Sequence, residues 1–239
     1  MKLEVCIDRL ESAMAAKAGG ADRLEVCGAL KIGGITPSYG LVEQCLGLGG
    51  IEVVAMIRPH EGGFCYEAAD IQTMIRDIQV VKDLGAHGVV LGVLQRDRRI
   101  DRELCRRLHD KTRPLSLTFH RAFDLTPDPR AAIDCLVELG IDRLLTSGQA
   151  ASALRGAKLI RELVNRAGHA ICVMPGGGIQ PADVVTLVRT TSVEEIHSSA
   201  SQPFVPADDD LLGIVQTTRV TSTASVRSLV AALREADRS

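Results

Sequence analysis

The feature that most constrains this chain is a regular alternation of short β-rich runs with longer helical stretches. Eight runs are expected to be strands, at residues 3–8, 23–27, 52–58, 88–93, 115–120, 143–147, 170–174 and 193–198. The stretches between them carry Ala, Leu, Glu and Arg at helical spacing, as over residues 70–84. Strands that alternate with helices indicate βαβ units and therefore a parallel sheet.

A weak internal repeat narrows the fold. The segments that follow a helical stretch and open a strand are Gly20-Ala21-Asp22-Arg23-Leu24, Gly85-Ala86-His87-Gly88-Val89 and Gly140-Ile141-Asp142-Arg143-Leu144. Each spacing corresponds to two βα units of about 30 residues, and eight such units fill a (β/α)8 barrel of typical size, about 250 residues. The chain has 239 residues. We therefore predict an α/β fold with one TIM-barrel domain over residues 1–239.

A doubly wound open sheet is the structural alternative. The first βα turn of that fold often carries a Gly-x-Gly-x-x-Gly motif that binds a dinucleotide. The first turn here reads Asp8-Arg9-Leu10-Glu11, which contains no glycine. The barrel is therefore the better prediction.

Composition limits the class of partner. The net charge is -2, and the aromatic residues are four Phe, two Tyr and no Trp, which argues against a nucleic-acid partner. No apolar run approaches the roughly 18 residues of a membrane span, and the charged start has no signal-peptide core. Seven cysteines without a Cys-x-x-Cys pair indicate reduced thiols. We expect a cytoplasmic protein that handles a small molecule or an ion.

Alternation along the strands predicts a polar barrel interior. If the apolar residues of each strand face the helices, their neighbours must face the barrel axis. The inward residues on strands one, two, five and eight are then Glu4, Cys6, Asp8, Glu25, Cys27, Ser116, Thr118, His120, Glu195 and His197. Buried charges are costly unless they are paired. We expect them to pair with one another, with Arg58 as the cation, or to serve a ligand.

Candidate catalytic residues cluster where the strands end, because TIM-barrel active sites lie at the C-terminal ends of the strands. We expect this group to comprise Glu25, Arg58, His120, Asp124 and His197. Asp124 or Arg121 beside His120 is a possible general acid–base pair. The alternative is a polar rim whose ion pairs are satisfied internally.

A glycine run predicts an anion site. Gly176, Gly177 and Gly178 follow the seventh strand, and Ser198 and Ser199 follow the eighth. Loops after strands seven and eight of TIM barrels frequently bind phosphate, and glycine lets backbone N–H groups approach an anion closely. The alternative is a simple tight turn.

Two cysteines occupy equivalent positions. Cys6 and Cys27 each end an identical Leu-Glu-Val-Cys quartet, on strands one and two. Adjacent strands lie about 4.8 Å apart, so two inward thiols could share one metal ion. Soft thiolates favour Cu(I) or Zn(II), and two ligands are too few for a closed tetrahedral zinc site. The alternative is a pair of buried, inert thiols.

The chain resembles the CutC copper-homeostasis family over nearly its full length. The matching segments are residues 3–6, 20–27, 33–38, 56–59, 118–124, 145–148, 174–178 and 196–200, among them Thr118-Phe119-His120-Arg121-Ala122-Phe123-Asp124 and Met174-Pro175-Gly176-Gly177-Gly178. The resemblance implies a cytoplasmic TIM barrel that forms a homodimer or higher homo-oligomer and is linked to copper tolerance. It also implies Cys6 and Cys27 as the Cu(I) thiolates.

The sequence departs from the family pattern in two places. His60-Glu61-Gly62-Gly63 stands where the family usually has Arg-Gly-Gly-Asp after Arg58-Pro59. Residues 201–223 are short and atypical, and we expect an irregular loop over the top of the barrel there.

Three hypotheses for function follow. The first is a copper-homeostasis protein that binds Cu(I) through inward-facing thiols. The second is a TIM-barrel enzyme of the isomerase or lyase type that acts on a small anionic or phosphorylated metabolite at the mouth of the barrel. The third is a barrel without a specific ligand.

Overall fold

Eight parallel strands form one sheet in the order β7-β6-β5-β4-β3-β2-β1-β8. The computed structural model describes residues 1–204 and 218–238. The strands are β1 Lys2–Ile7, β2 Arg23–Val26, β3 Glu52–Met56, β4 Gly88–Leu91, β5 Ser116–Phe119, β6 Arg143–Thr146, β7 Cys172–Pro175 and β8 Glu195–Ser198. A parallel bridge between Gly176 and His197 joins the two ends of the sheet.

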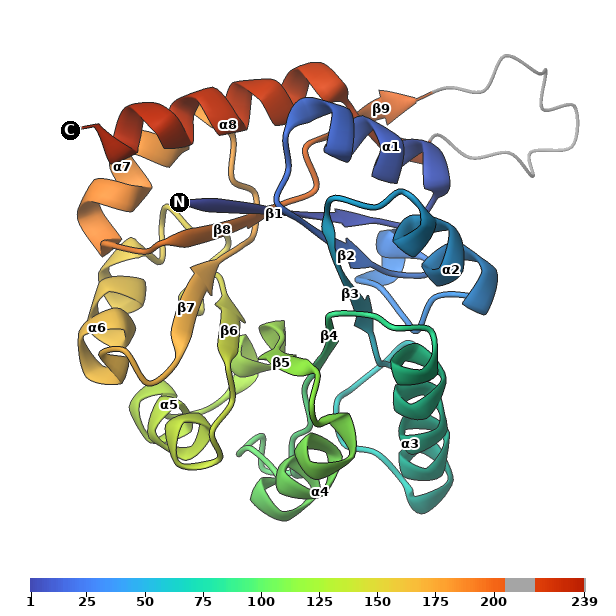
Figure 1. Ribbon diagram of the computed structural model, residues 1–239. Helices are drawn as coiled ribbons and strands as arrows, with labels where there is room; N and C mark the ends of the chain where they lie inside the picture. Colours follow the sequence, from blue (N-terminus) through green and yellow to red (C-terminus); the bar gives the residue numbers. More distant parts are fainter. Residues whose placement is uncertain (205–217, 239) are drawn as a thin grey trace, which may run out of the picture.

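Helices surround this sheet as an outer ring (Figure 1). They are α1 Leu10–Gly19, α2 Tyr39–Gly47, α3 Ala68–Asp83, α4 Arg102–Thr112, α5 Pro129–Glu138, α6 Ala157–Ala167, α7 Pro181–Thr191 and α8 Thr223–Asp237, with short 3-10 helices at Leu30–Ile32 and Arg121–Leu125. The predicted (β/α)8 TIM barrel is confirmed. Within the described residues, no helix is both long and apolar enough to cross a lipid bilayer.

The main apolar core lies between the strands and the helix ring. Leu3, Val5 and Ile7 of β1 are fully buried there, together with Ala13 and Ala16 on the inner face of α1. The intervening residues of β1 point to the barrel axis, as the period-two pattern predicts. This division leaves the polar side chains of the strands inside the barrel.

The internal repeat fixes the strand starts. Asp22 accepts a hydrogen bond from the backbone N–H of Leu3 at 2.8 Å, and Asp142 accepts one from Leu117 at 2.8 Å. In the middle copy, His87 Nδ1 takes the same place and accepts from the backbone N–H of Val53. Each repeat therefore ties the start of one strand to the start of the strand before it.

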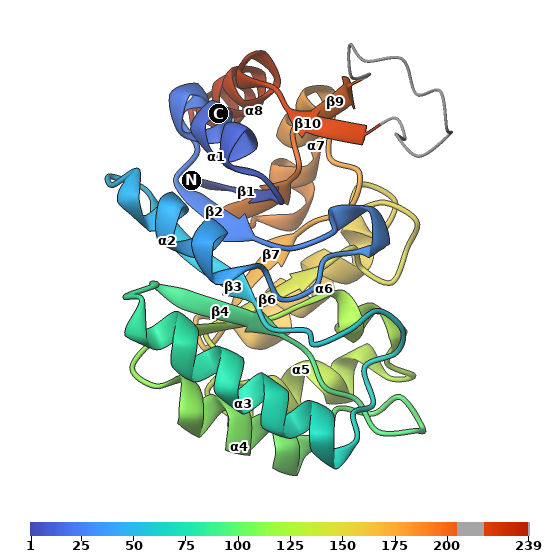
Figure 2. The same ribbon diagram turned by 90° about the vertical axis from the view of Figure 1, so that its right-hand side faces the viewer.

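The atypical segment after Ser201 is only partly irregular. Its two ends pair as an antiparallel ribbon, β9 Ser201–Phe204 and β10 Thr218–Thr221. This ribbon projects beside α8 and α1 (Figure 2). The remainder of the predicted loop, residues 205–217, lies outside the described residues.

Candidate metal centre

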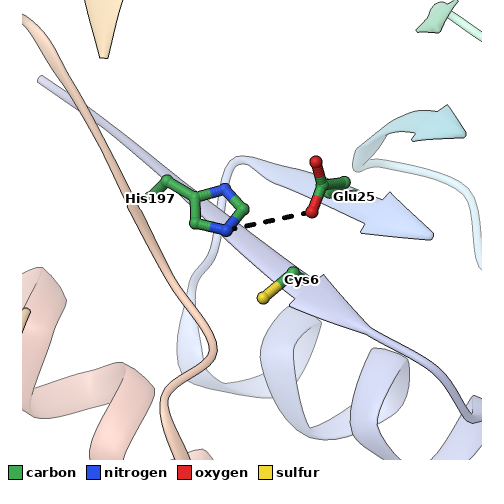
Figure 3. Close-up of side chains that lie close together, drawn as sticks. All are labelled: Cys6, Glu25 and His197. Atoms are coloured by element: carbon green, nitrogen blue, oxygen red, sulfur yellow. Dashed lines mark ion pairs between the residues drawn. The ribbon is translucent and has the colours of Figure 1, made fainter. Parts of the chain in front are cut away.

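Strand order and register assemble the polar interior from distant parts of the sequence. β1 lies between β8 and β2, and Glu4 is in register with His197 on one side and Arg23 on the other. Two residues further along, Cys6 is in register with Glu25. Because these residues all face the barrel axis, their side chains meet inside it. Figure 3 shows three of them, Cys6, Glu25 and His197, close together.

An ion-pair network fills the lower layer of the interior. Arg23, whose side chain is 1% exposed, donates to Glu4 and to Glu195. Arg143 also donates to Glu195, with Nε 2.6 Å from Oε2. Two guanidinium groups thus neutralise two carboxylates, which offsets the cost of burying them.

Arg58 is not the cation of this network, and that expectation was wrong. Its guanidinium donates to backbone carbonyls instead, at 2.9 Å to both Gly34 and Gly62, and lies 5.0 Å from the centre of the Phe64 ring. Arg58 follows the end of β3, where the alternation rule no longer determines where a side chain points. Gly62 belongs to the atypical loop of residues 60–63, which therefore still anchors this arginine.

Above the network lies a compact group of three potential metal ligands. Cys6 Sγ, a carboxylate oxygen of Glu25 and an imidazole nitrogen of His197 all lie within 4.8 Å of one another, and all three residues are buried. His197 Nε2 is 3.8 Å from Glu25 Oε2. On its other side, His197 Nδ1 is 2.8 Å from Glu4 Oε1. A thiol, a carboxylate and an imidazole therefore converge on one point.

Burial and neighbouring charges shift the pKa values of the acidic and basic side chains in and next to this group. Burial would raise the pKa of Glu4, but the hydrogen bond to His197 and the charge of Arg23 outweigh it and lower the pKa to about 2. Burial would lower the pKa of His197, but the neighbouring Cys6, Glu25 and Glu4 raise it well above its usual value. Burial raises the pKa of Glu25 to about 6 against the opposing charge of His197. Glu4 is thus ionised at neutral pH, with its carboxylate against Nδ1 of His197.

Cys27 lies next to this group but outside the close trio. Its Sγ is 3.5 Å from Glu25 Oε2, and the side chain is fully buried against Val54, Met56 and Val90. Burial, followed by the charge of Glu25, raises the pKa of this thiol well above its usual value. Glu25 therefore lies between the predicted pair of Cys6 and Cys27; the sequence placed it among the inward polar residues and the candidate catalytic residues, not among the metal ligands.

Two more predicted residues meet at the mouth of the barrel. His120 and Arg58 are both buried, and both line one cavity with Phe64. The Phe64 ring packs edge-on against the imidazole, with ring centres 4.9 Å apart. His120 Nδ1 accepts a hydrogen bond from the backbone N–H of Ala122.

Asp124 does not form the predicted pair with His120. Its carboxylate accepts hydrogen bonds from Arg121 Nε at 2.9 Å, from Thr146 Oγ1 at 2.5 Å, and from the hydroxyl and backbone N–H of Ser147. Through these hydrogen bonds, Asp124 holds the loop after β6 in place.

The predicted anion loops lie together. Gly177, Gly178, Ser198 and Ser199 line a cavity of about 260 Å³ after β7 and β8, whereas Gly176 takes part in the bridge to His197 instead. Arg121 and Arg219 also line this cavity. Sequence reasoning placed the loops but did not name Arg219, which lies in the atypical segment.

Sequence reasoning also missed Arg23 and Arg143. Both open a strand, and both stand in the aspartate-containing copies of the repeat. Extending the alternation of Cys27 and Glu25 back by two residues places Arg23 inward. The alternation therefore contains the signal for Arg23, but it places this cation at the start of a strand, whereas TIM-barrel sites lie at the C-terminal ends of the strands.

Comparison with known proteins identifies the relationship. The model of the CutC family matches residues 1–202. The chain belongs to the CutC family. It is 46% identical over 198 residues to the human copper homeostasis protein cutC homolog, with 83% of this chain and 72% of the human protein covered. It is 43% identical over 237 residues to a CutC family protein of Caulobacter vibrioides, with 97% of this chain and 96% of that protein covered.

Solved structures agree on the fold. A copper homeostasis protein CutC of Streptococcus agalactiae superposes with a TM-score of 0.79 at 34% identity, covering 83% of this chain and 98% of that one. Phosphoribosylanthranilate isomerase of Thermotoga maritima superposes with a TM-score of 0.62 at 14% identity, covering 98% and 99%. The second likeness concerns the barrel alone.

Proposed function

We propose that this chain is a cytoplasmic copper-homeostasis protein that holds Cu(I) inside the barrel, on the thiolates of Cys6 and Cys27 and on His197. The human and Streptococcus agalactiae members of the family carry the name copper homeostasis protein. All seven cysteines are free thiols, which suits a reducing compartment.

The observation that carries the proposal is the contact between Glu4 and His197. A histidine that binds a metal usually donates its other ring N–H to a carboxylate, which fixes the ring and raises its basicity. Glu4 Oε1 lies 2.8 Å from His197 Nδ1, so Nε2 is directed toward Cys6 and Glu25. An isolated pair of inert thiols would not need this arrangement.

The donor set fits a soft monovalent ion. Cu(I) prefers thiolate and imidazole ligands, and Cys6 and His197 supply one of each within 4.8 Å. Cys27 supplies a second sulfur beside Glu25. The ligands must lose their protons to bind a metal, so Cu(I) would take the place of protons within this buried group. Glu25 would remain close to the ion and balance its charge.

An anaerobic Cu(I) titration against a competing chelator tests the proposal. We expect one Cu(I) per chain, bound at least about 100-fold more weakly after the double substitution Cys6→Ser/Cys27→Ser. The matched control is Cys105→Ser, since this thiol is equally buried but lies on α4. It should leave the affinity unchanged.

Equal Cu(I) affinity in the double variant and the control would reject the proposal. Circular dichroism of both variants verifies that they remain folded. The homo-oligomer that belongs to the same proposal is tested separately, by light scattering of the purified chain with and without Cu(I).

A further inference from the structure

Two of the residues that line the cavity at the mouth of the barrel each carry a buried N–H donor without an acceptor. This cavity has a volume of about 230 Å³ and is lined by Arg58, Phe64 and His120, together with all three members of the metal group, Cys6, Glu25 and His197. Within the part of the chain that the structure describes, neither Arg58 Nε nor His120 Nε2 has a hydrogen-bond partner. Their residues are only 6% and 4% exposed. Leaving a buried donor without an acceptor is destabilising, so two such donors beside one cavity point to a ligand.

His120 is fixed as a neutral donor. Its Nδ1 accepts from the backbone N–H of Ala122, which leaves the proton on Nε2. Burial lowers the pKa of His120 to about 3, so the ring stays neutral at physiological pH. A Cβ at Gly92 would collide with the imidazole, and glycine there lets the backbone just after β4 pack directly against the ring.

Arg58 is equally constrained. Its two terminal nitrogens donate to the carbonyls of Gly34 and Gly62. These hydrogen bonds hold the guanidinium over the face of the Phe64 ring. Of the three guanidinium nitrogens of Arg58, Nε is the one that finds no hydrogen-bond partner among the described residues. Both orphan donors require an acceptor, which a hydroxyl, carbonyl or carboxylate oxygen provides.

A second cavity continues from the first. The cavity of about 260 Å³ at the loops after β7 and β8 shares Cys6, Arg121 and His197 with the mouth cavity. Gly177 and Gly178 have φ of 116° and 70°, a backbone conformation that favours glycine. A Cβ at Gly177 would lie 3.5 Å from Arg121 Cζ, so this guanidinium lies directly beside the loop.

We propose that the two cavities together bind one small phosphate ester, either a polyol phosphate or a sugar phosphate. The phosphate would lie between the loops after β7 and β8, with Arg121 and Arg219 as its cations. An oxygen of the carbon chain would accept from His120 Nε2 and Arg58 Nε. The combined space is at the lower end of ligand sites, which usually measure about 300–1,000 Å³. This ligand goes beyond the proposed copper function, although Cys6 and His197 line both cavities and it would therefore lie beside the proposed copper ligands.

Isothermal titration with inorganic phosphate tests the anion end. Arg121→Gln should weaken phosphate binding at least about fivefold, since it removes a charge-assisted contact. Arg166→Gln is the matched control, because Arg166 is also a half-exposed arginine paired with an aspartate, on α6. Equal effects of the two substitutions would mean an adventitious ion only, and no binding by the wild type would mean that there is no anion site; either result would overturn the proposal.

Titration with glycerol 3-phosphate and ribose 5-phosphate tests the mouth cavity, where the carbon chain of the ligand would accept hydrogen bonds from His120 and Arg58. At least one should bind about tenfold more tightly than inorganic phosphate, the size expected for two recovered hydrogen bonds. His120→Leu should remove that gain, and His120→Gln, which retains a donor, should restore most of it. A gain that survives His120→Leu, or no gain for either compound, would overturn the assignment.

The copper proposal can fail independently. His120→Leu and Arg121→Gln alter neither thiol nor His197, so both should keep the wild-type Cu(I) affinity. Phosphate-ester binding in the Cys6→Ser/Cys27→Ser variant would show that the organic site operates without the metal ligands.

Discussion

Arg23 is the residue on which the buried charges of the barrel converge. It contacts Glu4 and Glu195 directly, and Glu4 in turn contacts His197. A change at this position therefore reaches both the stability of the interior and the orientation of the candidate metal ligand. The same contacts explain why a charged side chain can be 1% exposed in a folded protein.

We predict that Arg23→Met lowers the free energy of unfolding by about 3–5 kcal/mol, because it removes the buried guanidinium that Glu4 and Glu195 share. Urea denaturation measures the change. Arg166→Met breaks an ion pair on the surface and should cost no more than about 1 kcal/mol. Equal losses in both variants would show that the buried network does not stabilise the barrel.

A second residue-scale prediction concerns pH. The pKa of His120 is lowered by burial to about 3 from 6.5, so between these values the unfolded chain binds a proton that the folded chain does not. Stability must then fall as pH falls through this window. From pH 7 to pH 5, the wild type should lose about 2 kcal/mol more than His120→Gln does. Parallel stability curves for the two proteins would contradict a neutral, buried His120.

At the scale of elements, the repeated aspartates connect local sequence to strand position. Asp142 ends the turn after α5 and accepts from the N–H that opens β5. Asp142→Ala should destabilise the protein by about 1–2 kcal/mol, whereas Asp110→Ala, on the exposed face of α4, should change stability by less than about 0.5 kcal/mol. Chemical denaturation compares the two. If Asp110→Ala costs as much stability as Asp142→Ala, the hydrogen bond of the repeat aspartate does not stabilise the start of the strand.

Elements are also the scale at which the sequence was most informative. The eight strands, and the inward direction of Glu4, Cys6, Glu25 and His197, followed from the period-two pattern, because one face of each strand has to pack on apolar helices. Arg58 and Asp124 were assigned the wrong partners for a physical reason. They lie outside the strands, Arg58 in the loop after β3 and Asp124 in the short 3-10 helix after β5, where side-chain direction depends on tertiary contacts and not on the strand period.

At the scale of the whole molecule, barrel closure creates the candidate metal centre. β8 pairs with β1, which brings His197 to Glu4 and Cys6 from the far end of the chain. No local pattern joins these positions, since the order of strands in space decides their contact. The thiol pair could be proposed from two identical quartets, but the imidazole and its carboxylate partner required the closed ring.

The measurement that tests the central claim most directly is X-ray absorption at the copper edge of the Cu(I)-loaded chain. Sulfur and nitrogen scatter differently, so the spectrum reports the ligands themselves. We predict two sulfur neighbours and one imidazole nitrogen, with the sulfur contribution lost in Cys6→Ser/Cys27→Ser. A spectrum with only nitrogen and oxygen neighbours, or one that the double substitution leaves unchanged, would contradict a copper centre inside the barrel.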